Sequence, residues 1–174
     1  MPMFQLGFKC ENPGKGEQAV RQEIIGDLAA EALFGESSKL YLQMYEDGLI
    51  DSSFGGGFET VDGMAILTCS GDSENPEGVK EAIVSNVETL LEAGIDEGDF
   101  LRMKRSALGR RIRDLDSFDS TCFRLCAYHF SGYDYHRFPA LYQSIQKEEV
   151  QAFLRRVVTR QRSCLSVIHP LKEA

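Results

Sequence analysis

Histidine is scarce in this sequence, and the few imidazoles present do not form a metal-binding motif. The 174 residues include three histidines, His129, His136 and His169, and no two of them are three or four positions apart. Helical zinc sites of hydrolases use H-E-x-x-H or its reverse, H-x-x-E-H, because one helix face must carry the ligands and the general base. Neither motif occurs, so the sequence excludes a local catalytic zinc site of this kind.

Other common signatures of catalysis and binding are also missing. There is no G-x-S-x-G elbow, P-loop or G-x-G-x-x-G, and no helical pattern follows the three glycines at 55–57. No apolar run approaches the roughly 20 residues of a membrane span. The net charge of −8 argues against general nucleic-acid binding. We therefore expect neither a membrane nor a nucleic acid as partner. Residues 1–10 carry no signal-peptide pattern, so we expect a cytoplasmic protein.

The five cysteines are too scattered for a disulfide framework, and their number is odd. Cys122 and Cys126 are one helical turn apart and could share a metal, but no second pair of Cys or His stands nearby to complete four ligands. We expect both to be buried as small apolar side chains.

Charge is divided unevenly along the chain. Residues 1–99 carry 20 acidic and 5 basic side chains, a net of −15, and residues 100–174 carry 7 acidic and 14 basic ones, a net of +7. Two interpretations stay open. The two parts neutralise each other within one fold, or one of them presents a charged face to a partner.

Hydrophobic periodicity divides the chain into strands and helices. The expected strands are 4–10, 50–61, 64–69 and 164–168, and the expected helices are 17–34, 38–47, 76–93, 96–115, 116–130 and 147–158. Asp62-Gly63 predicts a hairpin, and the glycines at 55–57 predict a bulge or a close backbone approach. This order predicts an α+β fold of two layers, a mainly antiparallel sheet covered by helices. We expect residues 1–174 to form one domain.

Two segments are each rich in one kind of side chain, aromatic in the first and basic in the second. Residues 128–142 are rich in Tyr, Phe and His, which indicates either a substrate-facing aromatic surface or a loop whose rings cover the helix layer. The predicted helix 96–115 turns Phe100, Leu101, Leu108 and Ile112 inward. It also carries basic residues that either attract an acidic partner or form a solvated face: Arg102, Lys104, Arg105, Arg110, Arg111 and Arg113.

Several segments in order carry a resemblance to one family. Residues 25–54 read as a helix, then G-E-S-S-K-L-Y, then G-L and a strand. Residues 76–105 read as a helix, a G-I-D-E-G-D-F turn and a Lys-bearing helix, and the last strand ends in I-H-P. Together these segments resemble the second half of bacterial insulinase-family (pitrilysin-type, processing-peptidase-like) zinc metallopeptidases. The likeness covers nearly the whole chain.

The resemblance implies a division of labour between two halves. Members are similar to clamshells in which the first half carries H-x-x-E-H and a distant Glu that bind zinc. The second half closes the chamber and helps to hold an extended peptide. For this chain the resemblance implies no cofactor of its own, zinc in an N-terminal catalytic half or homologous subunit, and a peptide substrate. It also implies that the chain is part of a longer one and is inactive alone.

The sequence departs from the family at one motif, L-R-x-x-x-G-L-x-Y. Anchored on Gly48, the Arg position falls on Met44, or on Tyr45 with one deletion, and the Tyr position falls on Asp51. The candidate peptide contacts are therefore Tyr45 and Asp51, with packing and turn formation as the alternative. From the aromatic segment we add Tyr133 and His136.

Three functional hypotheses follow from the sequence. The first is a non-catalytic, chamber-closing half of a zinc endopeptidase. The second, which the missing Arg and Tyr favour, is a pseudo-peptidase subunit that assembles with an active homologue. The third is a separate ligand-binding domain with an aromatic pocket at 128–142.

Overall fold

The structure is a computed structural model, and it describes residues 1–61 and 63–171. Its centre is a four-stranded antiparallel sheet in the order β2-β3-β1-β4, built from β1 (Met3–Lys9), β2 (Gly55–Val61), β3 (Met64–Asp72) and β4 (Ser163–Ile168). Leu6 of β1 lies opposite Cys69 of β3 and Leu165 of β4. The predicted pairing of 50–61 with 64–69 is confirmed, although Asp62 lies outside the described residues.

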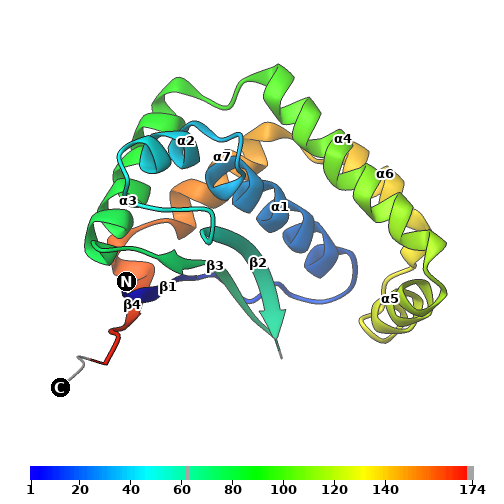
Figure 1. The fold of residues 1–174 in the computed structure, drawn as a ribbon. Helices are drawn as coiled ribbons and strands as arrows, with labels where there is room; N and C mark the ends of the chain where they lie inside the picture. The colour runs from blue at the N-terminus through cyan, green and yellow to red at the C-terminus, as the bar shows by residue number, and fades with distance from the viewer. Residues whose placement is uncertain (62, 172–174) are drawn as a thin grey trace.

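Helices cover one face of the sheet (Figure 1). The covering helices are α1 (Gly16–Phe34), α3 (Pro76–Ala93) and α7 (Lys147–Val157), with α2 (Lys39–Glu46) beside α1 and α3. Along β1 the buried side chains alternate with exposed ones, which places Phe4, Leu6 and Phe8 under the helices. The fold is α+β with a mainly antiparallel sheet, as the sequence predicts.

A helical arm projects from this body (Figure 1). It consists of α4 (Glu97–Arg113), α5 (Phe118–Phe130) and α6 (Phe138–Ser144), with short 3-10 turns at Asp114–Asp116 and Tyr135–Arg137. A third such turn, Arg160–Arg162, precedes β4. The Lys104 ammonium donates hydrogen bonds to the carbonyls of Gln143 and Ile145 at 3.0 and 2.8 Å, which fixes α4 against the end of α6.

Local signals set most helix starts. Ser38, Asn75 and Asp96 accept hydrogen bonds from backbone N–H groups three residues later, as N-caps do. No helix in the described part of the chain is both long and apolar enough to span a bilayer.

The acidic and basic parts of the chain form ion pairs with each other in the fold. Eight of the eleven ion pairs between described residues join an acid before residue 100 to a base after it, in agreement with mutual neutralisation.

Several predictions are wrong in detail. The first hairpin strand begins at Gly55, because Asp51 starts a turn in which its carbonyl accepts from the Phe54 N–H at 3.1 Å. Gly55–57 pair in regular register without a bulge. The predicted close backbone approach does occur, since a Cβ on Gly56 would lie 2.4 Å from the Phe34 ring.

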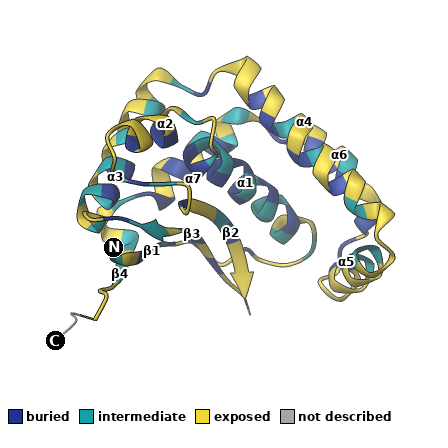
Figure 2. Ribbon diagram, in the orientation of Figure 1, coloured by how far each residue is buried: buried dark blue, intermediate teal, exposed yellow. Residues whose placement is uncertain are grey.

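The arm differs most from expectation. Of the four residues predicted to face inward on α4, Leu101 and Ile112 are exposed, because the buried stripe follows Phe100, Met103, Ala107 and Arg111. The segment 138–144 is a helix that the sequence interpretation did not anticipate. Cys122 and Cys126 are exposed, not buried, since α5 buries only Tyr128. Figure 2 shows this helix largely in the colours of exposed and intermediate residues.

Candidate functional site

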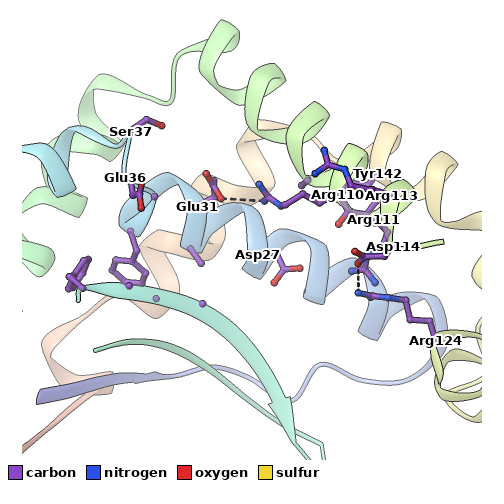
Figure 3. A pocket seen from close by; sticks show the side chains of 18 residues that line it. Asp27, Glu31, Glu36, Ser37, Arg110, Arg111, Arg113, Asp114, Arg124 and Tyr142 are labelled. Carbon is purple, nitrogen blue, oxygen red and sulfur yellow. Dashed lines mark hydrogen bonds and ion pairs between the residues drawn. The ribbon is translucent and has the colours of Figure 1, made fainter. Parts of the chain in front are cut away.

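A cavity of about 920 Å³ opens between the body and the arm. Its walls are the C-terminal half of α1, the start of β2, the C-terminal half of α4 and Arg124 of α5 (Figure 3). We call this cavity the β2 cleft. Its lining residues include three glycines, four arginines and four acids: Gly55, Gly56, Gly57, Arg110, Arg111, Arg113, Arg124, Asp27, Glu31, Glu36 and Asp114.

One wall of the β2 cleft is the edge of the sheet. β2 hydrogen-bonds to β3 on one side only, so its other side presents backbone N–H and C=O groups without a strand partner in the described part of the chain. A Cβ on Gly55 or Gly57 would meet nothing within 4 Å, whereas the Phe34 ring packs against Gly56 on the other sheet face. All three glycines line the cleft, so the unpaired edge of β2 adjoins it.

The opposite wall is rich in arginine, and most of its charge is paired. Arg110 Nη2 lies 3.4 Å from Glu31 Oε2 of α1, and Arg124 Nη2 lies 2.8 Å from Asp114 Oδ2 (Figure 3). Arg113 is exposed and makes no ion pair with any described residue. This wall can therefore offer guanidinium donors to a carboxylate or carbonyl of a bound chain.

A buried polar network holds this wall in place. Arg111 of α4 donates to the Tyr128 hydroxyl at 2.8 Å and to Glu23 Oε1 at 3.0 Å, and Tyr128 donates to Glu23 Oε1 at 2.7 Å. Burial raises the pKa of the Tyr128 hydroxyl, so Tyr128 keeps the proton that it donates. The three residues come from α1, α4 and α5, so the network connects the arm to the body.

Asp27 is the titrating group of the cleft. Burial, and then the neighbouring Glu23 charge, raise the pKa of its carboxyl to about 7, against the opposing effect of Arg111. It points into the space below the arm in Figure 3. The described residues contain no group of three or more His, Cys, Asp or Glu side chains that could hold a metal ion. The cleft thus combines an unpaired strand edge and guanidinium groups with one carboxyl of raised pKa.

The four sequence-predicted contact residues lie outside the β2 cleft, in two places. Tyr45 is half exposed and stacks on Tyr41, with ring centroids 6.1 Å apart. The Asp51 carboxylate accepts from the Ser53 N–H at 2.8 Å, and the Ser53 hydroxyl, followed by this N–H, lowers the pKa of the carboxyl. Tyr133 and His136 both line a second cavity.

This second cavity has about 660 Å³ and lies between the C-terminal half of α5 and residues 132–136; we call it the α5 groove. Tyr133 is buried there, and its hydroxyl has no hydrogen-bond partner among the described residues, while His136 is exposed. Of the residues lining the β2 cleft, the sequence interpretation had singled out the three glycines and Arg110, Arg111 and Arg113, but not Asp27 or Arg124.

Comparison with known proteins shows the family. Residues 1–107 match the model of the peptidase M16 inactive domain. The chain is 27% identical over 172 residues to the uncharacterized zinc protease YmfH of Bacillus subtilis, a match that covers 97% of this chain and 40% of YmfH.

Solved structures share the fold. An M16-like peptidase of Alicyclobacillus acidocaldarius superimposes with a TM-score of 0.85 at 22% identity, over 95% of this chain and 40% of that one. The inactive peptidase domain of a Bordetella parapertussis protein superimposes with a TM-score of 0.80 at 13% identity, over 100% of this chain and 93% of that one. The chain spans about 40% of the length of YmfH. The resemblance to the second half of an insulinase-type zinc peptidase is confirmed, and the chain belongs to the family of peptidase M16 inactive domains.

Proposed function

We propose that this chain is the non-catalytic half of a zinc-dependent endopeptidase, which closes the peptide chamber and helps to hold an extended substrate. The zinc and the water-activating glutamate would come from an N-terminal catalytic half or a homologous subunit. Its contribution would be positioning and exclusion of water rather than bond chemistry. Membership of the inactive-domain family and the longer zinc-protease relative support this division.

The observation that carries the proposal is the open edge of β2 beside the cleft. An extended peptide can pair with such an edge as an added strand, and main-chain hydrogen bonds then supply sequence-tolerant affinity. The glycines of this edge line the cleft, and the arginines opposite can contact the peptide from its other side.

Hydrogen exchange tests the proposal with an internal control. Saturation with a short unstructured peptide should slow amide exchange in Gly55–Val61 and leave Ser163–Ile168 unchanged, because β4 is the other edge of the sheet and lies away from the cleft. The same peptide with N-methylated amides should bind much more weakly, since it cannot pair. Equal protection of both edges, or no loss on methylation, would contradict pairing at β2.

The second candidate is a pseudo-peptidase subunit that assembles with an active homologue. Met44, on which the family's Arg position falls unless one deletion moves it to Tyr45, is buried, so it offers no group to a substrate. An intact H-x-x-E-H in the parent's other half, with hydrolysis that chelation abolishes, would favour the peptidase over this assembly role.

Tyr45, Asp51, Tyr133 and His136 stay predictions as peptide contacts. Substituting each by alanine and measuring peptide affinity by fluorescence anisotropy tests them one by one. A residue whose loss leaves the affinity unchanged has no such role.

A further inference from the structure

Helix α5 exposes far more apolar surface than a short helix of a monomer normally does. Of its 13 residues only Tyr128 is buried, while Phe118, Phe123 and Phe130 are 80%, 74% and 85% exposed. Single exposed apolar residues are ordinary, but large contiguous apolar patches mark interaction surfaces. The helix lies at the outer end of the arm, where a partner can reach it (Figure 1).

Four of the exposed residues form one row along the helix. We call this row the α5 ridge; its members are spaced four apart and are Phe118, Cys122, Cys126 and Phe130. Side chains four apart on a helix lie one above the other on the same face. The row reads the same in both directions, with an aromatic ring at each end and two thiols in the middle.

This symmetry matches a second copy of the same helix. Two helices whose four-spaced rows align cross at about −50°, the commonest packing class. If the second helix runs antiparallel, Phe118 of each copy lies opposite Phe130 of the other. Cys122 of each copy then lies opposite Cys126 of the other. A two-fold axis through the middle of the ridge generates the whole contact.

The α5 groove supplies the receiving surface. It is lined by Cys126, His129, Phe130 and Tyr133 among others, and therefore lies at the end of the ridge where Phe118 of a second copy would arrive. The helix dipoles agree as well, because the antiparallel arrangement brings the N-terminal end of each α5, with Asp119 in its first turn, toward the C-terminal end of the other.

We propose that α5 is a self-association surface, in which two copies of this chain pair their α5 ridges antiparallel and each Phe118 fills the other copy's α5 groove. An aromatic side chain offers roughly 150–250 Å². The four phenylalanines of the two copies therefore bury roughly 600–1,000 Å², to which the four thiols add, and this lies in the range of weak, transient interfaces. The dimer is accordingly expected to be of micromolar strength.

Sedimentation equilibrium tests the association. At roughly 100 μM the chain should approach twice its monomer mass of 19.5 kDa. Phe118→Asp should restore the monomer, since a carboxylate cannot enter the groove. The matched control is Met64→Asp, which changes a residue of β3 that is 69% exposed and lies off the ridge. This control should still dimerise. Both positions are exposed, so thermal unfolding should show both variants folded.

Thiol crosslinking tests the register. Copper(II) phenanthroline in air takes two electrons from a pair of adjacent thiols, which lose two protons and form a disulfide. Cys122→Ser alone and Cys126→Ser alone should each fail to crosslink, because the remaining thiol faces serine. An equimolar mixture of the two variants should crosslink. Cys164→Ser, at an exposed thiol on β4, should crosslink like the unchanged chain.

Three outcomes would overturn the proposal. A monomer at the highest concentration excludes self-association. Crosslinking within either single variant excludes the antiparallel register. Dimerisation that Phe118→Asp leaves intact places the interface elsewhere. If the chain is monomeric and its α5 thiols become unreactive only after a peptide or the catalytic half is added, that partner, and not a second copy, occupies the ridge.

Discussion

The buried Arg111 allows a quantitative test of how the arm is attached to the body. The residue is 8% exposed, and its guanidinium donates to both Tyr128 and Glu23. Arg111→Met keeps much of the side-chain volume but removes the cation. The Glu23 carboxylate then loses its counter-charge, and the Tyr128 hydroxyl loses one donor.

The expected magnitude follows from the burial of the pair. Breaking a buried ion pair by removing one partner costs about 3–5 kcal/mol of unfolding free energy. Because 29% of the Glu23 side chain remains exposed, water recovers part of this, and we expect about 2–4 kcal/mol. For a chain of this size, that loss corresponds to a fall in Tm of roughly 5–12 °C.

Urea unfolding of a double-mutant cycle measures the effect. Glu23→Leu combined with Arg111→Met should be more stable than Arg111→Met alone, because no charge is left buried without a partner. The control is Arg105→Met, at an exposed position of the same helix without an ion pair among the described residues, and it should change stability by less than about 0.5 kcal/mol. A loss below about 1 kcal/mol for Arg111→Met, or a double variant less stable than the single one, would refute the reasoning.

Three further predictions concern the core, the cleft and the thiols. Gly26→Ala should destabilise the chain by more than about 1 kcal/mol, because its Cβ would lie 2.3 Å from the Phe58 ring. Gly109→Ala, where a Cβ meets nothing within 4 Å, should stabilise it by about 0.5–1 kcal/mol; urea midpoints compare the two. Burial raises the pKa of the Asp27 carboxyl to about 7 in the folded chain, above its ordinary value of 3.8, so its contribution to stability should be lost as pH rises between these values. Asp27→Asn should therefore gain stability relative to the unchanged chain over that range, measured as urea midpoints against pH. At a chain concentration low enough to keep it monomeric, Ellman's reagent should find three fast thiols in the native chain and five after unfolding, because burial raises the pKa of Cys10 and Cys69 to about 11 and about 12.

Each of these has a result that would contradict it. Equal effects of the two glycine substitutions would show that the contact with Phe58 relaxes at no cost. A stability difference for Asp27→Asn that does not vary with pH would place the Asp27 carboxyl in water. More than three fast thiols in the native state would mean that the sheet opens readily.

Local chemistry made most of the fold predictable. The caps Ser38, Asn75 and Asp96 and the alternation of β1 depend on neighbours in sequence, so the elements and the antiparallel sheet could be anticipated. Which face of α4 is buried could not be anticipated. Its basic residue Arg111 turns inward because Glu23 and Tyr128, 88 and 17 positions away, provide its partners.

The β2 cleft was beyond sequence reasoning for a similar reason. Its walls come from residues near 27, 55 and 110, and no local pattern brings these together. The error about Cys122 and Cys126 has a different origin. Apolar residues on a helix predict burial, but the described chain provides no surface that covers α5. In the proposed dimer, a second copy of the chain covers these residues.

Elemental analysis combined with a peptidase assay tests the central claim most directly. The chain, purified without chelator and supplied with zinc, should retain no stoichiometric metal and hydrolyse no peptide, because its described residues provide no cluster of metal ligands. One tightly held zinc per chain, together with peptide hydrolysis that a chelator abolishes and zinc restores, would contradict the account.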